Sequence, residues 1–272
     1  MTSKSGGADT ESGFGETVRV VIHALLMLHD LEADGPAASR KLVRLRVPGR
    51  EGDGEAAEPA PPDLRFEVKG ASVVEHAASP MLALDLAIRD ATPGGAVEAL
   101  LLRCQVRIEP QLRGYSAAEE EALVELFGEP PRWERTARPF LWTHALVSVP
   151  PFRGEVRVEL PLPCSSDLVL ASARYFHGLD EGEAPLLLLF SGTVFHAAGA
   201  GALQAAQLPW SKEARYGLPV RVWRAMLDHH YPDRAGLLLR RDLVERLQQH
   251  RREARLAGLD QALESLLDGA GR

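Results

Sequence analysis

One stretch, Pro185 to Phe195, constrains the fold more than any other part of this sequence. Its residues Leu186 to Phe190 are all apolar, so a strand built from them would be buried on both faces. A helix is the alternative, but the short run, the internal Gly192 and the Thr-Val-Phe ending favour a strand. The stretch predicts a central strand of a sheet, with a bulge or a close backbone approach at Gly192.

Alternation of apolar and polar residues indicates further strands. In residues 100–108 it places Cys104 on the buried face, and Arg103 and Arg107 on the opposite face. Residues 82–88 alternate in the same way, and a Thr-Pro-Gly-Gly turn lies between the two segments. We therefore expect the two segments to pair as an antiparallel hairpin.

Helices are predicted mainly toward the C-terminus. Ser116 and Glu119 fit a capping box at the start of one helix, and residues 219–230 and 242–256 carry helical apolar stripes. Residues 167–174 are apolar enough to form another strand. Many strands followed by helices indicate an α+β fold with a sandwich-like antiparallel β-sheet and C-terminal helices.

Composition divides the chain into three predicted parts. Residues 1–47 form a partly disordered N-terminal appendage, or the assigned start lies too far upstream and part of it is not a folded unit. Residues 48–63, with four prolines and three glycines, form a linker. Residues 64–268 form the main α+β body, which can be divided into strand-rich halves at 64–135 and 136–268.

Charge and cysteine content argue against several classes of protein. The net charge of -7 disfavours nucleic-acid binding, which needs a basic surface. Cys104 and Cys164 are too few for a disulfide framework. No apolar run approaches the ~18 residues of a membrane span, and Arg19 and His23 interrupt residues 18–31, the segment that most resembles the apolar part of a signal peptide. We expect a cytoplasmic protein with no nucleic-acid partner and no membrane span.

Three residues are candidate metal ligands: Cys164, in a Pro-Cys-Ser-Ser turn, His177 and His144. Thiolate and imidazole suit transition metals, but no pair has the CxxC, HxxxH or HExxH spacing that identifies a metal site. A nucleophile–base pair from Cys164 or Ser191 is also conceivable, but no GxSxG motif surrounds Ser191. We predict no catalytic residue and no cofactor, and leave open whether the chain is an enzyme. The alternative is a metal-handling protein or enzyme that uses Cys164 with nearby histidines.

Large aromatic residues beside prolines and strand ends are candidate partner contacts. Such residues fit a packed core, and on the surface they can also bind an extended segment beside a strand edge. Exposed strand edges would also allow a homo-oligomer. The candidates for binding a polypeptide partner are Trp133, Trp142, Phe152 and Trp210.

Four longer segments carry a more specific pattern: RCQVRIEPQLRGYSAAEEEALVELFGEPPRW (residues 103–133), PFLWTHALVSVPPF (139–152), ELPLPCSSDLVLASARYFHGLDEGEAPLLLLFSGTVF (159–195) and LPVRVWRAMLDHHYPD (218–233). Together they resemble an uncharacterised, mainly actinobacterial domain family over about residues 64–260. The resemblance brings no catalytic residues. Members are often encoded near uptake nickel–iron hydrogenase genes, which implies a hydrogenase-associated accessory or maturation role with a hydrogenase subunit as partner.

A glycine-containing strand at residues 190–195 is followed by a predicted helix at 219–230, a Tyr-Pro turn and a second helix at 242–256. This order is similar to that of SecB-type export chaperones, although this chain is longer and has an additional strand-rich N-terminal half. The similarity implies SecB-like halves and a chaperone-like function. Both resemblances favour a non-catalytic accessory or assembly protein that binds a polypeptide.

Overall fold

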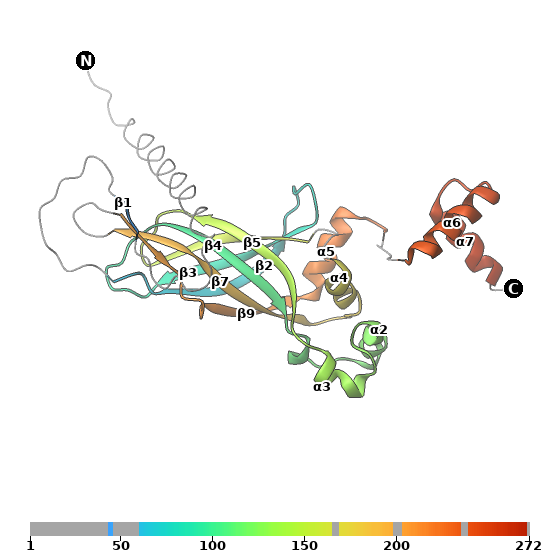
Figure 1. Cartoon of the computed structure of the whole chain (residues 1–272), viewed down its shortest axis with the longest axis horizontal. Helices are drawn as coiled ribbons and strands as arrows, with labels where there is room; N and C mark the ends of the chain where they lie inside the picture. The colour runs from blue at the N-terminus through green and yellow to red at the C-terminus, as the bar shows by residue number, and fades with distance from the viewer. Residues whose placement is uncertain (1–42, 46–59, 165–168, 198–202, 235–238, 271–272) are drawn as a thin grey trace, which may run out of the picture. The chain divides into compact units, whose positions relative to one another are not determined.

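The computed structural model describes residues 43–45, 60–164, 169–197, 203–234 and 239–270 (Figure 1). Most of the predicted appendage and linker lies outside these residues. The chain divides into two compact units, residues 1–230 and 231–272. The first contains two antiparallel sheets, and the second contains helices α6 (Arg241–Glu253) and α7 (Leu259–Ala270), which contact each other. The predicted α+β class, with antiparallel sheets and C-terminal helices, is confirmed.

The larger sheet is built around β7 (Glu183–Ala197), as the apolar run predicts. One edge of β7 pairs with β4 (Val97–Ile108). The other edge pairs first with β9 (Glu213–Pro219) and then with β8 (Leu203–Gln207). The sheet is completed by β5 (Phe140–Val149) beside β4 and β1 (Val43–Leu45) beside β8.

Gly192 lies at a close backbone approach within this sheet. It is opposite Leu102 in the register between β4 and β7, and its φ of 153° disfavours residues with a side chain. The register shift between these strands lies elsewhere, between Val97 and Ala99. Of the two alternatives predicted for Gly192, the close approach is therefore the correct one.

The smaller sheet has three strands in the order β2-β3-β6: β2 (Leu64–Val73), β3 (Met81–Asp90) and β6 (Glu155–Pro163). The predicted hairpin between residues 82–88 and 100–108 is wrong, because β3 and β4 belong to different sheets. The turn between them crosses from one sheet to the other. Its start is held by a 2.9 Å hydrogen bond from the Thr92 backbone N–H to Asp90 Oδ1.

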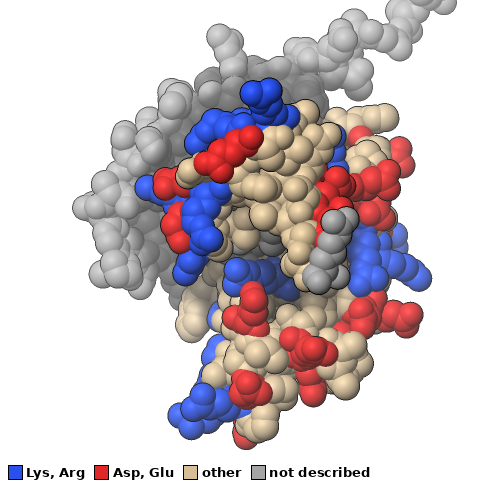
Figure 2. Space-filling view, turned by 90° about the vertical axis from the view of Figure 1, so that its right-hand side faces the viewer, with Lys and Arg blue, Asp and Glu red and all other residues tan. Residues whose placement is uncertain are grey.

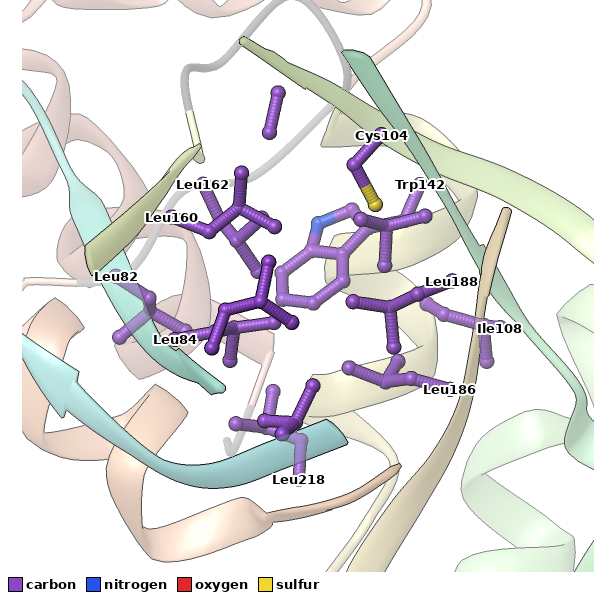
Figure 3. Packing of buried hydrophobic residues seen from close by; sticks show 14 of the residues in the cluster. Leu82, Leu84, Cys104, Ile108, Trp142, Leu160, Leu162, Leu186, Leu188 and Leu218 are labelled. Carbon is purple, nitrogen blue, oxygen red and sulfur yellow. The ribbon is translucent and has the colours of Figure 1, made fainter. Parts of the chain in front are cut away.

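The core lies between the inner faces of the two sheets (Figure 3). Leu84 of β3 and Leu160 of β6 approach it from the smaller sheet, and Cys104 of β4 and Leu188 of β7 from the larger one. Burying each leucine side chain contributes about 1.5–3 kcal/mol to folding. The alternation of residues 100–108 therefore predicted the buried face of β4 correctly.

The helices of the first unit lie at one end of its sheets (Figure 1). The predicted capping box is present, because Ser116 Oγ accepts from the Glu119 backbone N–H at 3.2 Å and Glu119 Oε2 accepts from the Ser116 N–H at 2.9 Å. No described helix has the length and apolar composition needed to cross a membrane. The helical segments are η1 (Pro110–Leu112), α2 (Ala117–Phe127), η2 (Pro130–Arg132), α3 (Trp133–Thr136), α4 (Val169–His177) and α5 (Val220–His230).

Two predicted elements need correction. Residues 167–174 were expected to form a strand, but the described part from Val169 belongs to helix α4. Packing explains the difference, since this helix buries Phe176 against Trp142 and Trp223, with ring centroids 5.0 Å apart in each pair. Strand β9 was not predicted, and it includes Pro219, which was expected to begin a helix.

The edges of the two sheets approach each other. Strand β5 of the larger sheet lies beside β6, and β9 lies beside β2. The Thr143 hydroxyl donates a 3.1 Å hydrogen bond to the Pro163 carbonyl and links the first of these pairs. The larger sheet therefore offers a partner its outer face rather than these two edges.

Candidate functional site

The outer face of the larger sheet, the side turned away from the core, carries exposed apolar side chains. Leu146 is 67% exposed and Leu141 is 43% exposed, both on the edge strand β5. Exposed apolar side chains that gather on one surface mark interaction sites in soluble proteins. Strand alternation assigns to this outer face Arg103, Gln105 and Arg107 of β4, Leu141, His144 and Leu146 of β5, Leu187, Leu189 and Ser191 of β7, and Glu213 and Arg215 of β9.

The register arranges these side chains in rows across the strands. In one row Leu146 lies opposite Arg103, which lies opposite Ser191. In another row Arg107 and Arg215 flank Leu187, which is buried. Each row thus combines arginine and leucine side chains.

The arginines of the outer face differ in how they are paired. Arg215, with 58% of its side chain exposed, donates a 2.8 Å hydrogen bond from Nη1 to Oε2 of the buried Glu109. Within the described part of the chain, neither Arg103 nor Arg107 has an ion pair or a side-chain hydrogen bond. These two guanidinium groups are therefore available to a partner.

A groove of about 480 Å³ lies at the η1 end of this sheet. Arg215 and Glu183 line it together with apolar groups, one of which, Leu112, is 52% exposed. Its volume is in the range of small ligand pockets, about 300–1,000 Å³. The full lining consists of Glu109, Leu112, Arg113, Glu183, Pro185, Leu186, Arg215, Tyr216 and Gly217.

Arg113 holds one wall of the groove in place. It donates to Glu119 Oε1 at 2.7 Å and to the carbonyls of Glu181 and Glu183 at 3.3 and 3.4 Å. Burial opposes ionisation of Glu119, but hydrogen bonds from the Ser116 and Asp180 backbone and the charge of Arg113 outweigh it, so the pKa of Glu119 is lowered. Arg113 is thus a structural clamp, whereas Arg215 is the exposed cation of the groove.

Trp210 lies in a tight turn that follows β8 and is 92% exposed. The turn closes with a 3.1 Å hydrogen bond from the Lys212 N–H to the Pro209 carbonyl. Lys212 also forms a 2.6 Å ion pair with Asp63 and accepts, through its carbonyl, a 2.9 Å hydrogen bond from the Phe190 N–H. These contacts fix the turn beside β7, next to the row that contains Arg103.

The family of unknown function DUF6084 matches residues 61–272 of this sequence. The chain belongs to this family. The expected membership of an uncharacterised family is thereby confirmed.

Comparisons with curated proteins and with solved structures do not indicate a function. A comparison with curated proteins finds no match. Among solved structures, β-glucosidase 3B from Thermotoga neapolitana in complex with α-D-glucose is 12% identical, with a TM-score of 0.21. The match covers 57% of this chain and 17% of that enzyme chain. A likeness this weak supports no conclusion about fold or activity.

The four aromatic residues predicted to contact a partner lie in different environments. Trp142 is 2% exposed and packs on Phe176, and Phe152 is buried at a backbone bridge to Val97. Trp133 is buried and donates a 2.6 Å hydrogen bond from Nε1 to the Gly128 carbonyl. Trp210 is therefore the one candidate of the four that lies on the surface.

The three candidate metal ligands do not come together. His144 lies on the outer face, opposite Gln105, whereas Cys164 packs against the inner core, with Sγ 3.4 Å from the Leu162 carbonyl oxygen. His177 ends helix α4 and meets Trp223 edge-on. No group of three or more His, Cys, Asp or Glu side chains in the described residues could hold a metal ion.

Burial also makes Cys164 a poor nucleophile and metal ligand. It raises the pKa of the Cys164 thiol to about 12, so the reactive thiolate is scarce at neutral pH. Burial lowers the pKa of His177, and the nearby Arg224 lowers it further.

Sequence reasoning identified the polar side of β4 but missed the outer face as a site. The signal that could have located it is the alternation in residues 140–149, which puts Leu141 and Leu146 at positions that do not face the core. A bulge at Trp142, where the β4–β5 register shifts, obscures that alternation.

Proposed function

We propose that this protein is a non-catalytic accessory protein that binds a polypeptide on the outer face of its larger sheet. The observation that carries the proposal is the exposure of Leu141 and Leu146 beside the unpaired Arg103 and Arg107. Protein-binding surfaces combine apolar anchors with arginine, whose fork of donors suits carboxylates and main-chain carbonyls. A single exposed leucine is common on protein surfaces and would not by itself indicate a binding site.

The partner is expected to dock on side chains and not to extend the sheet. Addition of a strand needs an edge with free backbone N–H and C=O groups. Since β5 lies beside β6, and β9 beside β2, those edges of the larger sheet are partly covered. Leu146 on the outer face, in contrast, is exposed to solvent.

A hydrogenase subunit is the partner to test first. This choice rests on the resemblance to a family often encoded near uptake nickel–iron hydrogenase genes, and on the weaker similarity to SecB-type chaperones. A maturation factor of this kind would act in the cytoplasm on a subunit that is not yet assembled. On the face of the molecule in Figure 2, acidic and basic side chains are interspersed, with no broad basic area of the kind that binds nucleic acid.

The test uses the full-length protein and separately purified hydrogenase subunits, with affinity measured by biolayer interferometry. Leu146→Asp is expected to weaken binding at least tenfold, because it places a charge in the apolar contact. Leu267→Asp is the matched control, since Leu267 is 72% exposed but lies on α7 in the second unit.

Two results would contradict the proposal. One is a Leu146→Asp variant that binds every subunit as tightly as wild type does. The other is stoichiometric nickel, zinc or iron in the purified protein that is lost in Cys164→Ala, which would support the metal-handling alternative.

A further inference from the structure

The row that starts at Leu146 crosses β4 and β7 and ends next to the turn that carries Trp210. Leu146 on β5, Arg103 on β4 and Ser191 on β7 are direct neighbours in the register. Beyond Ser191 the turn at residues 208–212 is joined to β7 by hydrogen bonds from the Leu208 and Phe190 N–H groups. With neighbouring strands about 4.8 Å apart, three steps span roughly 14 Å.

Apolar and charged side chains follow one another along this row. It has an exposed leucine at one end, and Arg103, which has no ion pair in the described part of the chain, comes next. Ser191, the smallest side chain in the row, lies between Arg103 and the turn that carries the exposed Trp210. The row and the turn therefore offer a partner two exposed apolar side chains and a positive charge.

The positive charge of the face is opposite to that of the protein. The chain has a net charge of -7, yet Arg103 and Arg107 have no acidic partner among the described residues. Two unpaired arginines on one strand of an acidic protein lower the cost of bringing an acidic partner to this face. Arginine also forms two parallel hydrogen bonds with a carboxylate.

We infer that the outer face selects an acidic polypeptide segment with large apolar side chains, which crosses the strands from Leu146 to Trp210 over Arg103. This inference rests on the proposed function and specifies its partner. An extended segment covers 14 Å with about four residues. The segment therefore places two apolar side chains about four residues apart, with Asp or Glu between them.

Three fluorescein-labelled peptides of 12 residues test the inference with the full-length protein. The first has two leucines four residues apart with glutamates between and around them, the second replaces every glutamate with lysine, and the third replaces both leucines with serine. Fluorescence anisotropy should show at least tenfold tighter binding of the first peptide than of either other. Its binding should also shift the emission of Trp210, because Trp133, Trp142 and Trp223 are buried.

Charge-reversed variants identify the residues responsible. Arg103→Glu combined with Arg107→Glu should weaken the acidic peptide at least tenfold and strengthen the lysine peptide. Arg132→Glu is the matched control, since Arg132 is exposed on η2 and outside the larger sheet. If the double charge reversal impairs folding, the double variant Arg103→Gln and Arg107→Gln removes both positive charges without adding negative ones, and it should also weaken binding of the acidic peptide.

The outcomes separate this inference from the proposed function. Equal binding of the acidic and lysine peptides, with both weakened by Leu146→Asp, would overturn the charge preference and leave the proposed function in place. Failure of Leu146→Asp to weaken any peptide or subunit would overturn the proposed function itself. An unchanged affinity in the double arginine variants, or an unchanged Trp210 emission in the complex, would also overturn the inference.

Discussion

Gly192 on β7 packs its backbone directly against the carbonyl group of Leu101 on β4. A Cβ atom at Gly192 would lie 2.1 Å from the Leu101 carbonyl oxygen, much closer than van der Waals contact allows. Leu101 belongs to one of the longest ladders of the larger sheet, so neither backbone can move without breaking hydrogen bonds. The contact makes glycine necessary at this point of the central strand.

Gly192→Ala is therefore expected to destabilise the protein by about 3 kcal/mol, through overpacking against a fixed backbone and an unfavourable φ. Urea unfolding followed by circular dichroism measures the change. Gly114→Ala serves as the control, because a Cβ atom there would meet no atom within 4 Å. Equal stability of the two variants would contradict the close approach.

Glu119→Gln should cost about 2 kcal/mol, because it removes the charge from a buried carboxylate that accepts hydrogen bonds from Ser116, Asp180 and Arg113. The pKa of Glu119 is lowered in the folded state, so its contribution is present above its ordinary pKa of 4.5 and is lost as the pH falls through the folded value. Unfolding free energies at pH 7 and pH 3.5 should therefore differ less in the variant than in wild type. Glu121→Gln, which alters an exposed carboxylate on the same helix, is the control for the loss of stability at pH 7 and should cost much less than Glu119→Gln.

His196 should make the protein less stable in weak acid. Its side chain is buried, and its Nε2 and the Oδ2 of Asp90 lack hydrogen-bond partners in the described part of the structure. Burial lowers the pKa of His196, more than Asp90 and a hydrogen bond with the Ala197 backbone raise it. The unfolded chain then binds a proton more readily, so stability is fully present above the ordinary pKa of 6.5 and falls as the pH drops toward the folded value.

His196→Gln tests this by urea unfolding at pH 7.5 and pH 5.5. The variant should lose less stability between these two pH values than wild type does. His177→Gln should have a smaller effect, because the residue is largely exposed and loses water only where its ring meets Trp223, whereas His196 is buried. A wild-type pH dependence in His196→Gln would show that this histidine does not titrate as its burial implies.

Cys164 should react slowly with thiol reagents in the native protein. Burial raises its pKa from 9.0 to about 12, which lowers the thiolate fraction at pH 8 roughly 1,000-fold. Modification by iodoacetamide at pH 8, followed by mass spectrometry, should label Cys164 promptly only after unfolding in urea. Rapid labelling of the folded protein would make a chemical role for Cys164 plausible again.

Local patterns in the sequence were enough to predict much of the fold. Alternation in residues 100–108 placed Cys104 inside and Arg103 outside, because successive side chains of a strand point to opposite faces. The capping box at Ser116 predicted the start of α2, because both of its hydrogen bonds are made within four residues. The apolar run predicted that β7 is central, because such a strand must be covered on both faces.

Long-range packing decided the rest. The sequence by itself determined most of the strands and which of their side chains share a face, whereas only the tertiary structure decided that β3 and β4 lie in different sheets and that residues from Val169 onward form a helix. It also decided that Trp142 is buried while Trp210 is exposed, although both stand near prolines in similar surroundings. The physical reason is that alternation depends on the strand alone, but pairing and exposure depend on residues far away in the chain, such as Phe176 beside Trp142.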